Sequence, residues 1–177
     1  MRVNAAITIN IREHAMPISS HSQVPTRRRL LQAFAATALA PAMTPLLAQA
    51  APVAIEVWKD PQCGCCKDWV SHLEANGFRV KVNEVGNSAA RQRLGMPQEL
   101  GSCHTGLVQG YVLEGHVPAG DVRRLLAEKP KALGLAVPGM PVGSPGMDGP
   151  AYGGRRDPYE VLLVGKDGAR KVFSRYG

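Results

Sequence analysis

The sequence predicts an α/β fold, a sandwich built on a mixed β-sheet, and three observations support this prediction. A strand, a helix and a second strand follow one another in residues 53–82, which is the pattern of a βαβ unit with parallel strands. A further helix with one apolar face is expected over residues 121–129. Two strands separated by a Gly-Lys-Asp-Gly turn in residues 159–173 predict a terminal β-hairpin.

Each part of the βαβ unit has its own pattern. Residues 53–58 are short, β-branched and aromatic, as expected of a buried strand. Apolar side chains recur at helical spacing in residues 65–76, and an Asn-Gly pair ends that helix. Residues 78–82 alternate between apolar and polar side chains and therefore predict the second strand.

The middle of the chain predicts shorter elements. A short helix is expected over residues 87–94, where an Asn-Ser pair begins it and a Gly-Met-Pro sequence stops it. Residues 107–117 are expected to form a hairpin that turns at residues 114–115. Asp121 is expected to cap the helix that follows.

Residues 131–158 show no periodicity and are rich in glycine and proline. A segment of this length without regular structure is usually functional or disordered.

The first fifty residues have the features of an export signal. Residues 26–32 are basic with paired arginines, residues 30–47 are apolar and alanine-rich, and Ala48 and Ala50 are small, as a signal peptidase requires. These features predict a signal peptide over residues 1–50, of the twin-arginine type, and a periplasmic or exported protein.

A membrane anchor is the alternative interpretation of this apolar segment. Pro41 and Pro45 interrupt it, and it falls short of the ~20 apolar residues that span a bilayer comfortably. We therefore expect cleavage near Ala50 and no stable membrane span afterwards. The remaining residues 51–177 are of suitable length for one domain.

The net charge changes when the expected signal peptide is removed. The whole chain has a formal net charge of +7. Residues 1–50 contain five arginines and one glutamate, so residues 51–177 keep 16 basic and 13 acidic side chains, a net charge of about +3. Much of the basicity therefore belongs to the export signal, and nucleic-acid binding loses its main support.

Three of the four cysteines lie together in a Cys-Gly-Cys-Cys sequence, where the predicted helix begins. A helix N-terminus stabilises a thiolate, which favours both attack on disulfides and binding of soft metals. In a redox reaction Cys63 would attack and Cys66 would resolve. Cys65 is a wrong partner for that disulfide but an additional ligand for soft metal ions.

Further sulfur and nitrogen donors follow in the sequence. Cys103 lies in a glycine-rich loop, where it is a candidate ligand or disulfide partner, although a lone cysteine is often a small buried side chain. His104 beside it is a second candidate, with a solvated loop histidine as the alternative. We expect His116 to be a hydrogen-bonded structural residue and His72 to lie on a helix surface.

Met140 and Met147 occupy a polar, glycine-rich loop with no apolar stripe to join. Thioethers are soft ligands that select Cu(I), and both methionines are therefore candidate ligands. Zinc is the competing metal, because four cysteines can form a tetrahedral site. The cysteine spacing is not that of two separate C-x-x-C knuckles, and zinc would leave the methionines unexplained. Copper is favoured, as Cu(I).

Several segments in combination resemble the periplasmic CopG-like copper-resistance proteins, a family long catalogued as a domain of unknown function. They are Trp-Lys-Asp-Pro before the C-x-C-C motif, Ser-Cys-His-Thr at 102–105, Gly-His-Val-Pro-Ala at 115–119, Gly-Met-Pro at 139–141, Gly-Ser-Pro-Gly-Met at 143–147, and residues 159–164. The resemblance covers nearly all of residues 53–173. It implies a thioredoxin-like sandwich fold and copper ligands drawn from the four cysteines, with Met147 nearby. In thioredoxin-like folds a loop that carries a cis-proline faces the C-x-x-C motif, and by this analogy we expect a cis bond before Pro141 and a position for its loop near Cys63.

Three functions remain open on the sequence. The first is an exported copper-binding protein that takes up Cu(I) through the C-x-C-C thiolates for copper homeostasis or resistance, and that passes it to a copper efflux or redox partner protein. The second is an enzyme, a periplasmic thiol–disulfide or copper oxidoreductase that uses Cys63 and Cys66. The third is an exported fold with two structural disulfides.

Overall fold

One mixed β-sheet forms the centre of the described structure, a computed structural model that describes residues 51–177. The predicted signal peptide, residues 1–50, lies outside the described residues. The sheet has seven strands in the order β2-β1-β3-β4-β5-β6-β7. The strands are β1 (Ala54–Lys59), β2 (Arg79–Asn83), β3 (His104–Val108), β4 (Tyr111–Glu114), β5 (Gly134–Ala136), β6 (Tyr159–Val164) and β7 (Arg170–Tyr176). The helices are α1 (Gly64–Ala75), α2 (Ser88–Arg93) and α3 (Ala119–Glu128), with short 3-10 turns η1 (Gln98–Leu100) and η2 (Pro150–Tyr152).

The pairing of the strands confirms the predicted α/β class and mixed sheet. β1 and β2 run parallel with α1 between them in the sequence, as the βαβ unit requires. β3 lies antiparallel to both β1 and β4, and β4 and β5 are parallel. β6 and β7 form the predicted terminal hairpin. The order β2-β1-β3-β4 is compatible with a thioredoxin-like core.

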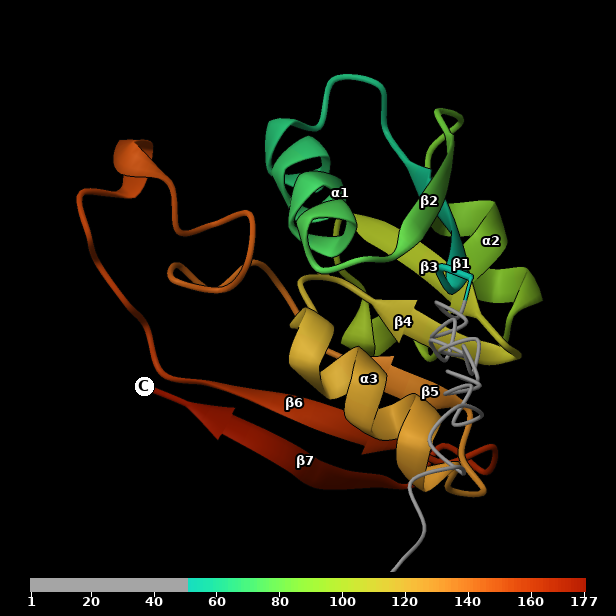
Figure 1. Cartoon of the computed structure of the whole chain (residues 1–177). Helices are drawn as coiled ribbons and strands as arrows, with labels where there is room; N and C mark the ends of the chain where they lie inside the picture. The colour runs from blue at the N-terminus through green and yellow to red at the C-terminus, as the bar shows by residue number, and fades with distance from the viewer. Residues whose placement is uncertain (1–50) are drawn as a thin grey trace, which may run out of the picture. The chain divides into compact units, whose positions relative to one another are not determined.

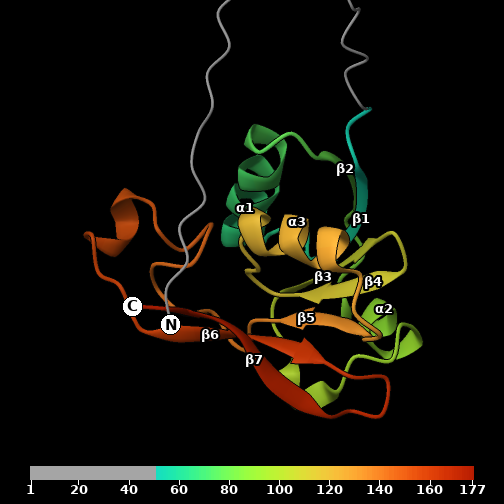
Figure 2. The same cartoon turned by 60° about the horizontal axis from the view of Figure 1, so that its bottom comes forward.

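Helices cover both faces of the sheet. α1 and α3 lie on one face and α2 lies on the other (Figures 1 and 2). Neighbouring strand residues alternate between the two faces. Leu113 packs in the larger apolar cluster with the side chains of α1 and α3, while Val112 packs in a smaller cluster with Met96 and Leu100 after α2. In residues 51–177, no helix has the length and apolar character needed to cross a membrane.

The hairpin in the middle of the chain turns earlier than predicted. β3 and β4 are joined at Gln109 and Gly110, whose φ angles are 45° and 86°, and not at residues 114–115. Two successive left-handed residues give the turn whose twist matches a two-residue hairpin. Glu114 therefore belongs to β4, where it pairs with Thr105 of β3.

The glycine- and proline-rich segment contains a strand that its composition did not predict. β5 pairs with β4 on one side and β6 on the other, so the terminal hairpin extends the same sheet. The strand has only three residues, too few for alternation to be visible in the sequence. The buried Leu135 and Ala136 lie on its opposite faces.

Two other local predictions need correction. α3 begins at Ala119 after Pro118, so Asp121 lies inside its first turn, where its carboxylate accepts hydrogen bonds from Ser174 and Tyr176 of β7. No cis peptide bond occurs in residues 51–177, so the predicted cis bond at Pro141 is wrong.

Candidate metal centre

The N-terminus of α1 holds the cysteine cluster at one end of the sheet. Asp60 begins the turn before it, since its carbonyl oxygen accepts from the Cys63 N–H and its carboxylate accepts from the Gln62 N–H. Cys63 is the N-cap residue, and the first turn of α1 contains no acidic side chain. The unpaired N–H groups of this turn therefore favour a thiolate, as the sequence predicts.

The four cysteine sulfurs lie within 4.8 Å of one another. Cys63 and Cys66 form a disulfide, while Cys65 and Cys103 are free thiols. The Cys65 sulfur lies 3.6 Å from the Cys63 sulfur and 3.8 Å from the Cys103 sulfur. Cys65 therefore bridges the C-x-x-C pair and Cys103 in space. Cys66 is fully buried and Cys63 is partly exposed.

Cys103 comes from the loop directly before β3, 38 residues beyond Cys65. Its carbonyl oxygen lies 3.5 Å from the Cys66 sulfur. This loop therefore meets the C-x-x-C motif at Cys66. Burial, with the nearby Cys65 as a smaller cause, raises the pKa of the Cys103 thiol to about 12.

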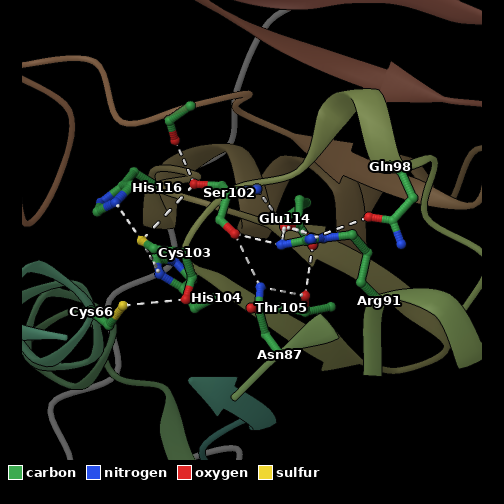
Figure 3. Close-up of polar contacts among 11 residues, drawn as sticks. Cys66, Asn87, Arg91, Gln98, Ser102, Cys103, His104, Thr105, Glu114 and His116 are labelled. Carbon is green, nitrogen blue, oxygen red and sulfur yellow. Dashed lines mark hydrogen bonds and ion pairs between the residues drawn. The ribbon is translucent and has the colours of Figure 1, made fainter. Parts of the chain in front are cut away.

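Two histidines converge on Cys103 (Figure 3). His104 places its Nδ1 atom 3.3 Å from the Cys103 sulfur, and His116 places its Nε2 atom 3.2 Å from it. The Nδ1 atom of His116 lies 2.8 Å from the carbonyl oxygen of Pro145 and donates to it. In the neutral ring, the lone pair of Nε2 then faces the sulfur.

His104 is fully buried between neighbouring rings. It stacks on Trp69 at 4.1 Å between ring centroids and meets His116 edge-on at 4.9 Å. Burial lowers the pKa of His104 well below its usual value, and His116 adds to this. Its Nε2 atom has no hydrogen-bond partner among residues 51–177. The predicted alternative of a solvated loop histidine is therefore wrong, because β3 carries this side chain into the core.

The methionine-containing loop reaches the cysteine cluster at Gly146. A Cβ atom at this position would lie 2.6 Å from the carbonyl oxygen of Cys65 and 2.8 Å from the backbone nitrogen of Trp69. Only a glycine, here with φ +84°, allows this close approach. Met147 follows directly, half-buried, and its sulfur accepts a hydrogen bond from the Tyr152 hydroxyl at 3.2 Å. Met140 is 52% exposed.

The sequence identified the cysteines and His104 but not the position of His116. The structural role expected for His116 is present in its bond to Pro145, yet its second nitrogen faces Cys103. In the sequence, His116 has a glycine before it and a proline two residues after it. Neither neighbour predicts how the imidazole ring is oriented. His72 is half-buried on α1, and its Nε2 atom accepts the N–H of Ala119 at the start of α3.

Comparison with known proteins places the chain in a family. A model of the family described as "Protein of unknown function, DUF411" matches residues 100–147. Two solved structures, named copper resistance protein copG, forms 1 and 2, are each 50% identical to the chain, with TM-scores of 0.65 and 0.66. The chain belongs to the copG family of copper resistance proteins. The two copG structures cover 71% of this chain, which covers 98% and 99% of them. No curated protein matches the sequence.

The donor set of this copG-family site is soft and compact. Four sulfurs surround the start of α1, and two imidazoles join them through Cys103, which belongs to both groups. Thiolates favour Cu(I), zinc and iron–sulfur clusters, and imidazoles suit copper and zinc. With the Cys63–Cys66 disulfide reduced, the site can offer four thiolates to metal ions; with it formed, two thiols and two imidazoles remain.

Proposed function

We propose that this protein binds copper as Cu(I) through the thiolates of Cys63, Cys65, Cys66 and Cys103, as part of copper homeostasis or resistance. The observation that carries this proposal is the convergence of the four sulfurs within 4.8 Å, from two segments far apart in the sequence. Sulfurs this close can bridge neighbouring metal ions, and soft thiolates select Cu(I). The names of the two copG structures support the choice of copper.

The histidines fit a copper ligand set. A metal-binding histidine usually donates its other ring N–H to a carbonyl oxygen, which orients the ring. His116 has this arrangement, with Nδ1 on Pro145 and Nε2 toward Cys103. His104 directs its buried Nδ1 atom at the Cys103 sulfur, 3.3 Å away, which supports a second imidazole in the ligand set. We propose His116 as the better placed imidazole ligand and His104 as the second.

The methionines have different places in this proposal. Gly146, directly before Met147, packs against the backbone of α1, and the Met147 sulfur accepts a hydrogen bond from the Tyr152 hydroxyl; both contacts support a place for this thioether near the cluster. We propose Met147 as a thioether ligand at the edge of the site. Met140 is exposed, and it would contact a copper ion only while the ion enters or leaves the site.

The proposal includes export and a partner. A cluster of thiols in an oxidising compartment needs a reason to remain reduced, and bound Cu(I) supplies one. The predicted signal peptide of residues 1–50 supports a periplasmic location. Because the protein would hold a toxic ion that must be removed, a copper efflux or redox protein is the expected recipient.

An anaerobic Cu(I) titration against a competing chelator tests the binding proposal. The reduced protein should bind Cu(I) tightly, and the double variant Cys63→Ser/Cys66→Ser should lose most of this affinity. Zinc titrated in parallel should compete poorly with Cu(I). Equal Cu(I) binding by the wild type and the double variant would end the proposal.

The disulfide between Cys63 and Cys66 favours a second candidate, an oxidoreductase. The Cys63 and Cys66 thiolates would each give one electron to a Cu(II) ion, producing two Cu(I) ions and the disulfide. An external dithiol would then reduce the disulfide by exchange and become oxidised itself. The buried Cys66 beside a more exposed Cys63 suits this sequence of steps.

Turnover distinguishes the two candidates. With Cu(II) and a dithiol reductant, an oxidoreductase should form Cu(I) catalytically, faster than the reductant alone and faster than the Cys66→Ser variant. Stoichiometric Cu(I) uptake without turnover leaves binding as the function.

A further inference from the structure

A buried carboxylate lies behind the metal centre, on the side of the sheet that α2 covers. Glu114, at the end of β4, is fully buried. It accepts hydrogen bonds from the Arg91 guanidinium at 2.9 Å, the Ser102 N–H at 2.7 Å and the Thr105 hydroxyl at 2.7 Å. Burial raises the pKa of Glu114, and the bonds from Arg91 and Thr105 oppose that rise.

Ser102, directly before Cys103, is held on both sides of its backbone (Figure 3). Its N–H donates to Glu114, and its carbonyl oxygen accepts from Arg91 and, at 3.1 Å, from the Asn87 amide. Its hydroxyl donates to the carbonyl oxygen of Gly139, at the start of the methionine loop. We call the contacts of Arg91, Glu114 and Asn87 with Ser102 the Ser102 clamp.

Stability alone is a weak reason for such a clamp. Bringing two opposite charges out of water costs nearly as much as their attraction returns, and apolar replacements of similar size are often as stable. The clamp instead fixes a loop whose next residue is Cys103, the thiol shared by the sulfur and imidazole groups. An irregular loop would otherwise move on the scale of the distances that metal ligation requires.

We propose that Arg91 and Glu114 are positioning residues that hold the Cys103 thiol within ligand distance of Cys65 and His116. They touch no metal themselves and act through the backbone of Ser102. Asn87 supports the same carbonyl oxygen from the N-terminus of α2. This inference rests on the proposed copper site for its purpose, but its geometric content can be tested without metal.

The metal-free test measures how accessible the Cys103 thiol is, from the rate at which it is alkylated. In the protein with the Cys63–Cys66 disulfide intact, Cys65 and Cys103 are the free thiols, so iodoacetamide labelling of Cys65 is an internal reference. The double variant Arg91→Met/Glu114→Leu removes both charges together. The ratio of Cys103 to Cys65 labelling rates should rise about tenfold, because lost buried hydrogen bonds let the loop open more often.

Two further variants keep this test decisive. Asn87→Ala removes one donor to Ser102 without burying a charge, and it should raise the same ratio severalfold. Asp121→Asn is the matched control, since it alters a buried carboxyl that bonds to Ser174 and Tyr176 instead, and its ratio should stay within twofold of the wild type. If the double variant does not unfold cooperatively, it is not properly folded, and the labelling ratio of Asn87→Ala then tests the proposal. An unchanged ratio in the folded clamp variants overturns the proposal.

Copper affinity then tests the purpose of the clamp. The double variant should lose about tenfold in Cu(I) affinity in the native background and show no further loss in a Cys103→Ser background, because the clamp acts through that thiol. An equal loss of Cu(I) affinity in the native and the Cys103→Ser backgrounds would contradict the proposal that the clamp positions the Cys103 thiol. If the wild type binds no Cu(I), the proposed function fails, and the alkylation ratio still tests the clamp.

Discussion

At the scale of single residues, Cys103 is the point where the parts of the site meet. Its sulfur lies within 4 Å of Cys65, His104 and His116, which come from α1, β3 and the turn after β4. A substitution at this one position therefore removes the link between the thiolate and imidazole groups. The role of each imidazole is the part of the site that needs testing first.

The variant His116→Gln should lower Cu(I) affinity by about tenfold or more, since it removes a nitrogen oriented toward the shared sulfur. A chelator competition titration measures this change. His72→Gln is the control, because half-buried His72 is also a hydrogen-bonded histidine but contacts Ala119 on α3. Equal effects of the two variants would show that His116 has only a structural role.

His104 makes the stability of the metal-free protein depend on pH. Its pKa in the folded state is well below the value of about 6.5 in the unfolded chain. As the pH falls below about 6.5, the unfolded state binds the proton first, and the free energy of unfolding decreases by up to about 1.4 kcal/mol per pH unit.

Urea denaturation of the metal-free protein between pH 8 and pH 5 measures this decrease. His104→Phe keeps an aromatic ring on Trp69 and should make the dependence shallower. The buried His116, whose pKa burial also lowers, retains part of the slope. Identical slopes in the variant and the wild type would contradict the assignment.

Residue chemistry could be predicted from the sequence where it depends on spacing alone. The three cysteines around Gly64 had to share the start of one helix, whatever the rest of the fold. Cys103 could be proposed as their partner because soft donors were concentrated in the chain. His116 could not be assigned, since its ring direction depends on a bond to Pro145, 29 residues away.

At the scale of elements, the segment between β5 and β6 approaches α1 closely at Gly146. Gly146 packs against the backbone of Cys65 and Trp69, and η2 supplies Tyr152 to the sulfur of Met147. The segment lies beside α1 in both views of the molecule (Figures 1 and 2). Its position therefore depends on the absence of a side chain at residue 146.

The variant Gly146→Ala should move this segment away from the metal centre. Its Cβ would lie 2.6 Å from backbone and its left-handed φ adds strain, a combined cost of about 1–3 kcal/mol. We expect faster proteolysis between β5 and β6 and weaker Cu(I) binding. In this background, Met147→Leu should cause no further loss.

Gly149→Ala is the control for this variant. No atom lies within 4 Å of a Cβ at that position and its φ is −71°, so proteolysis and copper affinity should match the wild type. If Gly146→Ala behaves in the same way, the contact does not hold the segment in place.

Long, periodic elements could be predicted from the sequence, whereas short ones depended on tertiary contacts. α1 and β6 have enough residues to display their periods. β5 has three residues and exists because β4 and β6 flank it. The β3–β4 turn differs from the prediction because a Glu-Gly pair is typical of a turn, whereas Gln109, a rare left-handed non-glycine residue, forms the turn in the structure.

At the scale of the whole molecule, all the candidate ligands lie in residues 51–177, and the proposed export signal, residues 1–50, precedes them in the sequence. The copG structures cover 71% of the chain at 50% identity, which supports a folded unit of similar size. The net charge of about +3 on this unit gives it no strong attraction to polyanions.

A chain of residues 51–177 should therefore fold and bind Cu(I) with the same affinity as the full-length protein. Thermal unfolding and chelator competition on both chains check this expectation. In bacterial cells, replacing Arg27, Arg28 and Arg29 by lysine should retain the uncleaved protein in the cytoplasm. Periplasmic protein from the wild type should begin at Ala51 by mass spectrometry; a mature form that keeps residues 1–50 would contradict the signal peptide.

The copper ligands themselves provide the most direct test of the central claim. X-ray absorption at the copper edge of the protein loaded anaerobically with Cu(I) identifies the nearest atoms by element. We predict a first shell dominated by sulfur, with an imidazole contribution that His116→Gln removes and sulfur scattering that Cys65→Ser and Cys103→Ser reduce. A first shell of nitrogen and oxygen alone, unchanged in the cysteine variants, would contradict the claim that these thiolates bind copper.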